Sequence, residues 1–357
     1  MERPAVAHGA SETRPAASST IGVAVVGCGY WGPNLVRVFS ALDHSEVHAV
    51  YDLDAQRVVG VRRRYPAVRA VTEFRELLDD PTIDALAICT PVHSHYDLAR
   101  AALEAGKHVL VEKPLTHSAE TAEKLVELAE KQRLVLQVDH TFVYSGAVQK
   151  IRSIIDSGVL GELLYVDSVR VNLGLFQSDV SVLWDLAPHD ISIITYLIDK
   201  TPLWVSAIGS THYGPVENQA YVTLKFDNSF IAHLHVNWLA PVKLRSTLIG
   251  GSKRMIVYDD LEPSEKIRVY EKGVTLTNDP RQRERVLVDY RTGDMFAPYI
   301  DKTEPLERVC RTFLDCIGTC TAPPTDGHAG LAVVRILEAA ERSMRQDGER
   351  VWLDRRR

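Results

Sequence analysis

The chain has 357 residues, of which 45% are hydrophobic and 25% are charged, so it is long enough for two domains with separate cores. The formal charge of -6 and the pI near 6.1 exclude a globally basic surface, and we therefore expect no nucleic-acid partner. Charges or prolines interrupt every apolar run before the roughly 20 residues that a membrane span needs, so no membrane association is expected.

Residues 1–20 are rich in Ala, Pro, Ser and Thr and lack the apolar core of a signal peptide, which predicts a disordered tail. The odd number of cysteines and the absence of a Cys-x-x-Cys pair favour a reducing, cytoplasmic location and argue against a metal site. The five cysteines are Cys28, Cys89, Cys310, Cys316 and Cys320. Cys310 and Cys316 fall in an apolar helical pattern and are expected to be buried.

Buried strands alternate with amphipathic helices over residues 21–142, a pattern typical of a doubly wound parallel sheet that binds nucleotides. The predicted strands cover residues 21–27, 47–52, 85–90, 108–113 and 134–140. The predicted helices cover residues 34–42, 74–80, 95–106 and 119–132, with Gly106 as a C-cap.

A different pattern over residues 143–357 predicts a second, α+β domain with an open, largely antiparallel sheet. Long strands are expected at 163–173, 204–213, 220–238, 246–260 and 265–276, with hairpin turns at Asp227-Asn228 and Lys272-Gly273. Helices are expected at 146–158, 188–198, 304–318 and 329–345.

A glycine-rich turn follows the first strand and opens the first helix, in the sequence Gly27-Cys28-Gly29-Tyr30-Trp31-Gly32. Its first glycine permits the turn, the second allows the backbone to approach a diphosphate, and the third allows the helix to meet the strand. Asp52 ends the second strand, where a carboxylate accepts hydrogen bonds from the adenine ribose and repels a 2'-phosphate. We therefore expect NAD, while Arg57 and the run 62–64 leave NADP possible.

Hydride transfer between an alcohol and a nicotinamide needs a group that takes or returns the hydroxyl proton. Lys113 ends a predicted strand at the carboxyl edge of the sheet, where open parallel sheets bind ligands. Asp185 and His189 are four residues apart around the predicted start of a helix, with Pro188 in its first turn. This spacing allows the carboxylate to orient an imidazole that titrates near neutral pH.

The glycine turn, Thr90-Pro91, the sequence EKPL and the sequence WDLAPHD occur together and in one order. In this the chain resembles the glucose–fructose oxidoreductase, inositol dehydrogenase and rhizopine-catabolism family from about residue 21 to residue 347. The resemblance implies an N-terminal Rossmann domain (21–142), a substrate-binding and oligomerisation domain (143–357), and homodimers or homotetramers formed through the second sheet.

By motif, the resemblance implies that Lys113, Asp185 and His189 are catalytic. It places Thr90, Pro91, His93 and His95 beside the cofactor, and Glu112 near the nicotinamide ribose, and it implies a cis Lys113-Pro114 bond. Tyr144 matches the start of a Tyr-Asn-Pro sequence, from which Ser145-Gly146 departs, and is expected to contact the substrate. Further candidate substrate contacts are Arg170, Trp184, Lys243 and Arg245, whose cations and ring suit a sugar nucleotide.

The substrate predicted from a similarity to nucleotide-sugar enzymes is a nucleotide-linked hexose, with a hydroxyl and a ketone interconverted at C3. The same chemistry on an aminosugar, an aminoglycoside-type sugar or a cyclitol is the alternative, and the net acidity favours a cationic aminosugar. A hypothesis of another class is a non-catalytic regulator that binds NAD(P). The simultaneous presence of Lys113, Asp185 and His189 argues against it.

Overall fold

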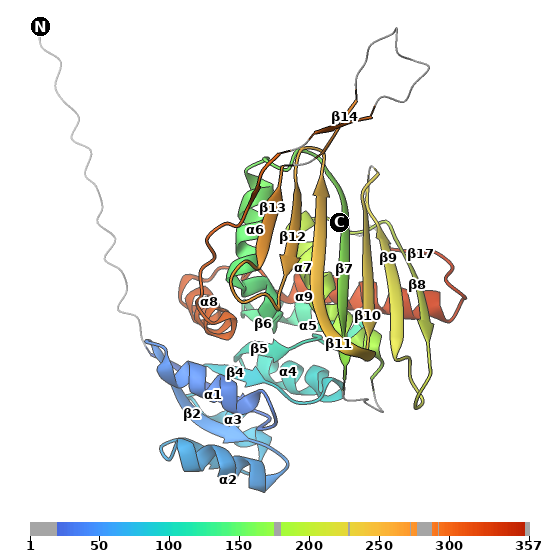
Figure 1. The fold of residues 1–357 in the computed structure, drawn as a ribbon. Helices are drawn as coiled ribbons and strands as arrows, with labels where there is room; N and C mark the ends of the chain where they lie inside the picture. Colours follow the sequence, from blue (N-terminus) through green and yellow to red (C-terminus); the bar gives the residue numbers. More distant parts are fainter. Residues whose placement is uncertain are drawn as a thin grey trace, which may run out of the picture.

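The computed structural model describes residues 20–174, 180–227, 229–271, 273–276, 288–291 and 293–353. Except for Thr20, the predicted N-terminal tail lies outside these residues. Over the described ranges the chain forms a parallel sheet and a larger, mainly antiparallel sheet, which lie in the lower and upper halves of Figure 1. No helix in the described ranges has the length and hydropathy of a membrane span.

The first sheet has the strand order β3-β2-β1-β4-β5-β6, and every pair is parallel. Its strands are β1 (Ile21–Val26), β2 (Ser45–Tyr51), β3 (Arg69–Val71), β4 (Ala85–Ile88), β5 (His108–Glu112) and β6 (Leu136–Asp139). The predicted Rossmann sheet is therefore confirmed, and β3 is a short strand that the sequence pattern missed. The strand order reverses between β1 and β4, which creates the crevice where such sheets bind ligands.

Helices cover both faces of this sheet because its central strands are apolar on both sides. They are α1 (Gly32–Ala41), α2 (Ala55–Arg64), α3 (Phe74–Asp79), α4 (His95–Glu104) and α5 (Ala119–Gln132). A short 3₁₀ helix, η1 (Val92–Ser94), precedes α4, and Gly106 beyond α4 has a φ of 76°, as expected of a C-cap position.

The second sheet has the order β16-β13-β12-β11-β7-β10-β9-β8-β17 in the described part of the chain. Its strands are β7 (Leu163–Leu173), β8 (Trp204–Ser210), β9 (Gln219–Lys225), β10 (Ile231–Asn237), β11 (Leu239–Gly251), β12 (Met255–Asp259), β13 (Ile267–Tyr270), β16 (Met295–Phe296) and β17 (Val351–Trp352). Only the β7–β10 pair is parallel among these strands, which confirms the open, largely antiparallel sheet.

One of the two predicted hairpins is confirmed and the other is wrong. Strands β9 and β10 pair antiparallel around the turn at Asp227, although Asn228 lies outside the described residues. After β13 the chain instead enters β14 (Gly273–Leu276), which pairs with β15 (Val288–Arg291) in a separate small sheet beyond the main sheet (Figure 1). The edge of β13 is occupied by β16, so it cannot pair with β14 across Lys272, which itself lies outside the described residues.

Helix α7 (Val182–Ile198) begins six residues earlier than predicted, and Pro188 lies inside it rather than in its first turn. The helix starts early because Val182 and Leu183 are fully buried in the second core and Asp185 N–H donates to the Ser181 carbonyl at 3.0 Å. Asp185 and His189 therefore occupy the first two helical turns, on one side of α7.

The last two helices return the chain to the first domain. Helix α8 (Pro305–Thr319) buries Phe313 against Phe39 of α1, with ring centroids 6.5 Å apart, and belongs to the same core as β1. Helix α9 (Gly327–Met344) contributes to the cores on both sides, and α6 (Gly146–Asp156) packs with α7 under the second sheet. The two sheets are thus joined by shared helical packing.

Candidate active site

The glycine turn between β1 and α1 has the shape that a diphosphate requires. Gly27 has a φ of 96°, and a Cβ at Gly32 would lie 2.0 Å from the Gly27 carbonyl oxygen, so side chains are excluded at both positions. A Cβ at Gly29 would meet only Arg57 Nη1, at 3.8 Å, which leaves open space beside the backbone. No side chain caps the α1 N-terminus, but Pro33 has no amide N–H and the Asn34 amide already donates to the Trp31 carbonyl at 2.9 Å, so Gly32 is the first-turn residue whose amide can face an anion. Tyr30 and Trp31 are exposed at this turn.

The Asp52 carboxylate is held at the end of β2 by two backbone amides, from Cys28 at 2.6 Å and from Asp54 at 2.8 Å. Arg57 Nη1 lies 3.9 Å from Asp52 and its Nε lies 3.5 Å from Asp54, so two carboxylates already balance this cation. Residues 62–64 end α2 as an exposed basic run. The arrangement fits the ribose hydroxyls of NAD better than the 2'-phosphate of NADP.

In the loop after β4, only some of the residues predicted to bind the cofactor are open to the crevice. Pro91 and His93 are exposed, and Thr90 Oγ1 accepts a hydrogen bond from Ser94 at 2.7 Å. His95 is instead 1% exposed, with its ring nitrogens 2.8 Å from the Thr90 carbonyl and 3.0 Å from the Pro114 carbonyl. The expectation that His95 faces the cofactor needs correction, because these contacts use the ring to join two loops.

Lys113 extends from the end of β5 to the start of α7 in the second domain. Its Nζ donates to the Asp185 backbone carbonyl at 2.9 Å and lies 3.6 Å from Asp185 Oδ1. Asp185 Oδ2 accepts from the indole N–H of Trp238 at 3.2 Å. The Lys113-Pro114 bond is cis, as expected from the motif. A cation from one domain is therefore fixed against a carboxylate of the other.

His189, one turn after Asp185, is half-buried and packs edge-on against Phe142, with ring centroids 4.9 Å apart. Burial, followed by the nearby positive charge of Lys113, lowers the pKa of His189 well below its usual range, so the imidazole is neutral. No hydrogen bond joins it to Asp185 in the described part of the chain, contrary to the expected orientation of the imidazole by that carboxylate. Asp185 positions Lys113 instead.

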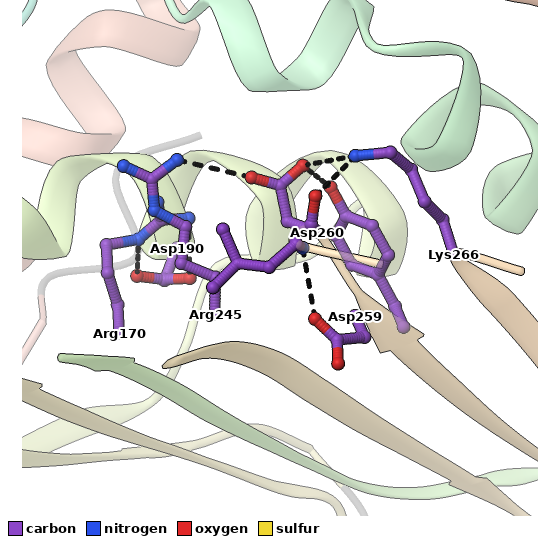
Figure 2. Close-up of polar contacts among 8 residues, drawn as sticks. Arg170, Asp190, Arg245, Asp259, Asp260 and Lys266 are labelled. Atoms are coloured by element: carbon purple, nitrogen blue, oxygen red, sulfur yellow. Dashed lines mark hydrogen bonds and ion pairs between the residues drawn. The ribbon is translucent and has the colours of Figure 1, made fainter. Parts of the chain in front are cut away.

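Arg170 does not have the role expected of it. It lies 4% exposed on the inner face of β7, where Nε and Nη2 donate to the Asp190 carboxylate at 2.6 and 3.2 Å (Figure 2). Its guanidinium also lies over the Phe142 ring, 4.5 Å from the centroid. A cation that is neutralised and buried in this way is not available to a substrate phosphate, so the predicted substrate contact needs correction.

Arg245 is half-buried, 5.5 Å from the same Phe142 centroid, and Nη1 donates to Asp260 at 3.2 Å. Lys266 approaches the other oxygen of Asp260 at 3.3 Å, so this carboxylate holds two cations (Figure 2). Lys243 is exposed in the irregular first half of β11, and Trp184 is partly buried where the two domains meet. These three predicted substrate contacts stay predictions.

Tyr144 is a second correction among the predicted substrate contacts. Its ring is 4% exposed in the first core, and its hydroxyl lies 2.9 Å from Thr325 Oγ1, so it does not line the site. Four residues were missed by the sequence analysis, namely Phe142, Asp190, Asp139 and His140. The pair Asp139-His140 carried a usable signal, because polar residues that end a buried parallel strand point to its functional edge.

Family models match both domains. The description "Oxidoreductase family, NAD-binding Rossmann fold" covers residues 21–140, and a GFO/IDH/MocA C-terminal domain covers residues 148–257. Inositol 2-dehydrogenase 2 of Saccharopolyspora erythraea is 30% identical over 65% of this chain and 71% of its own length. The chain belongs to the Gfo/Idh/MocA family. It is therefore an NAD-binding oxidoreductase rather than a non-catalytic regulator.

Two further known proteins extend the comparison. UDP-N-acetylglucosamine 3-dehydrogenase of Acidithiobacillus ferrooxidans is 27% identical over 88% of this chain and 94% of its own length. The crystal structure of GenD2 from gentamicin A biosynthesis in complex with NAD is 23% identical, has a TM-score of 0.78, and covers 98% of this chain and 100% of its own. At this identity the GenD2 structure establishes a shared fold.

Proposed function

We propose that this Gfo/Idh/MocA oxidoreductase interconverts a secondary hydroxyl and a ketone, at C3 of a nucleotide-linked hexose, with Lys113 and His189 handling the proton. The observation that carries the proposal is the contact of Lys113 with Asp185, one helical turn before His189, across the domain boundary. NAD suits the turn at Gly29 and the carboxylate of Asp52, and its nicotinamide supplies hydride acceptance and donation.

The chain's own residues divide the remaining work. The Lys113 ammonium, held by Asp185, polarises the substrate oxygen and stabilises negative charge on it during the reaction. His189 is neutral, which is the form that accepts a hydroxyl proton in the oxidation direction. Glu112, predicted near the nicotinamide ribose, is 8% exposed at the end of β5 and lies beside Asp139.

The substrate class is supported by the UDP-N-acetylglucosamine 3-dehydrogenase relative, which aligns along most of the chain. A cyclitol or an aminosugar is the second candidate, because Asp190 neutralises Arg170 and Asp260 neutralises part of the charge near Arg245. This leaves fewer free cations for a diphosphate than the sequence suggested.

Calorimetric titration with UDP and TDP separates the two classes. Binding of either nucleotide at or below millimolar concentration, followed by nicotinamide reduction with the corresponding hexose, is expected. Absence of nucleotide binding together with turnover of myo-inositol would remove the nucleotide-linked class and leave the dehydrogenase assignment intact. No nicotinamide reduction with any sugar or cyclitol would contradict the proposed reaction itself.

A homodimer or homotetramer is proposed through the outer face of the second sheet. This face carries exposed apolar side chains, which single chains rarely leave unpaired. They are Ile208, Tyr221, Ile231 and Leu244. Light scattering of the purified protein, compared with an Ile208→Asp variant, tests this assembly. The free cysteines of the described residues suit a cytoplasmic location, which is also proposed.

A further inference from the structure

Beyond Lys113, a run of buried titratable side chains continues into the protein. Glu112 and Asp139 end the neighbouring strands β5 and β6 and are partners in the strand register. Glu112 is 8% exposed, Asp139 is 2% exposed and His140 is 1% exposed. None of the three is needed for the proposed contacts of Lys113 and His189 with the substrate oxygen, so their burial requires another explanation.

The two carboxyl groups interact with each other. Asp139 Oδ1 accepts from Thr141 Oγ1 at 2.7 Å, and the Asp139 and Glu112 side chains contact each other. Two ionised carboxylates in contact and away from water repel strongly, whereas one protonated group can donate to the other. Burial raises the pKa of Asp139 to about 6 and raises that of Glu112 well above its usual range, against the opposing charge of Lys113.

The other titratable groups around this pair carry no compensating positive charge. The neighbouring groups that face the pair are neutral, because burial raises their pKa values. They are Cys89 directly after β4, Cys310 from α8 and Tyr144 from the segment after β6. Lys113 is therefore the cation that faces the pair in the described part of the chain.

His140 is the next group in the run. Neither ring nitrogen has a hydrogen-bond partner among the described residues, and burial followed by the charge of Lys113 lowers its pKa to about 3. Nδ1 of His189 is likewise buried without a hydrogen-bond partner among the described residues, and His140 is one of the groups that lower the pKa of His189. Buried polar atoms of this kind normally bond to ordered water. A neutral imidazole offers one donor and one acceptor, which suits proton transfer.

His140 also lines a cavity of about 650 Å³ between α6, α7 and α9. On α7 the cavity is lined by Ser192 and Tyr196, which follow His189 by one and two turns on the same side of the helix. At its other end the cavity reaches Asp156 and His328, whose side chains are 55% and 62% exposed. The cavity thus connects buried His140 with the protein surface along α7.

We propose that His140, together with the Glu112–Asp139 pair, carries the hydroxyl proton from the Lys113 and His189 site to solvent through this cavity. The inference rests on the proposed function. In oxidation, the C–H hydrogen leaves with both electrons to the nicotinamide, and neutral His189 takes the O–H proton as the C=O bond forms. The proton then passes to the Glu112–Asp139 pair, which hands one proton to His140, and His140 releases it to cavity water, so one proton reaches solvent and each group regains its starting charge. Ketone reduction reverses each step.

Replacement of His140 by Ala tests the route in the NAD-dependent oxidation of UDP-N-acetylglucosamine or myo-inositol, whichever the wild-type protein turns over. In dilute buffer, kcat is expected to fall about 10-fold to 100-fold and to recover with added imidazole, while KM for NAD stays constant. The solvent deuterium isotope effect on kcat is expected to rise. His140→Gln, which fills the space without carrying a proton, should show the same loss and serves if the Ala variant folds poorly.

His48→Ala is the matched control, because His48 is another partly buried histidine, on β2, and does not line the cavity. It should keep kcat and show no imidazole effect. If both His140 variants keep the wild-type kcat and do not respond to imidazole, the proton route is refuted. The proposed function still holds in that case, because the wild-type protein turns over its substrate. Absent wild-type turnover contradicts the proposed function instead.

Infrared spectroscopy of the protein without ligands tests the carboxyl pair independently of activity. At neutral pH a protonated carboxyl band that shifts in deuterium oxide is expected, and Asp139→Asn or Glu112→Gln should remove or displace it. A wild-type spectrum without such a band would overturn the role of the pair, and Glu307→Gln on the exposed face of α8 is the control substitution.

Discussion

The Asp185 carboxylate lies 3.6 Å from the Lys113 ammonium, and the same ammonium donates to the Asp185 backbone carbonyl at 2.9 Å. This double contact ties the end of a first-domain strand to the first turn of the helix that carries His189. It makes the separation between Lys113 and His189 depend on domain packing rather than on a flexible loop. The proposed chemistry therefore rests on a preorganised pair.

Replacing Lys113 with Met should lower kcat/KM by about 10²-fold to 10⁴-fold, because the substrate oxygen loses its cationic partner. NAD affinity, measured by quenching of intrinsic fluorescence, should change little. Lys124→Met, at an exposed position of α5, provides the matched loss of a lysine charge. Turnover equal to wild type in Lys113→Met would contradict the catalytic assignment.

Replacing Asp52 with Ser should raise the preference for NADP over NAD by at least about tenfold, because a carboxylate that repels a 2'-phosphate is removed. The loss also releases Arg57 from one of its two acidic neighbours. Dissociation constants for both dinucleotides measure the change. Asp54→Ser is the control, because serine can still cap α2, and it should leave the preference for NAD unchanged. An equal change of the NADP-to-NAD preference in both variants would argue against a specific role of Asp52.

Replacing Arg170 with Met should destabilise the protein by about 3–5 kcal/mol, because the Asp190 carboxylate remains buried without its partner. The double variant Arg170→Met, Asp190→Leu should recover part of that loss. Denaturant unfolding gives the free energies. The control is Arg345→Met, which breaks an exposed ion pair with Glu341 and should lower the free energy of unfolding by less than about 1 kcal/mol. An equally small decrease in Arg170→Met would show that the buried pair does not stabilise the fold.

Asp139 should make stability fall as pH rises. Burial raises its pKa from 3.8 to about 6 in the folded chain. Below the unfolded pKa both states are protonated, so the penalty is absent. Between about pH 4 and pH 6 only the unfolded chain ionises, and the free energy of unfolding falls by about 3 kcal/mol.

The comparison with Asp139→Asn isolates this effect from other acids, such as Asp301, whose lowered pKa of about 2 acts in the opposite direction. Denaturant unfolding at several values between pH 4 and pH 7 should show the stability difference between Asn variant and wild type growing with pH. A difference that stays constant over this range would exclude the raised pKa.

The first domain was predictable because its strands are buried on both faces and its glycine turn has one structural meaning. The same holds for Lys113, which follows a strand at the functional edge. Burial partners were not predictable in this way. Arg170 and Tyr144 were predicted to contact the substrate. In the fold, Arg170 instead donates to Asp190, and the Tyr144 hydroxyl lies beside Thr325, and the sequence around each residue does not reveal these partners.

The start of α7 was misplaced because Pro188 is a local signal for the first turn of a helix, whereas the burial of Val182 and Leu183 that starts the helix earlier depends on tertiary packing. The Lys272-Gly273 hairpin failed for a related reason, since the pairing of β13 with β16 depends on a segment more than 20 residues away. Local turn chemistry is weak evidence where another strand competes for the same edge.

The return of α8 to the first sheet affects any attempt to dissect this enzyme. A fragment ending at residue 142 would keep the whole dinucleotide crevice but would present Phe39 and its apolar neighbours to water, because Phe313 normally covers them. Such a fragment should precipitate rather than bind NAD on its own. Chimeras that exchange the sugar-recognition region should therefore splice in residues 146–300 and retain α8 from the recipient of the graft.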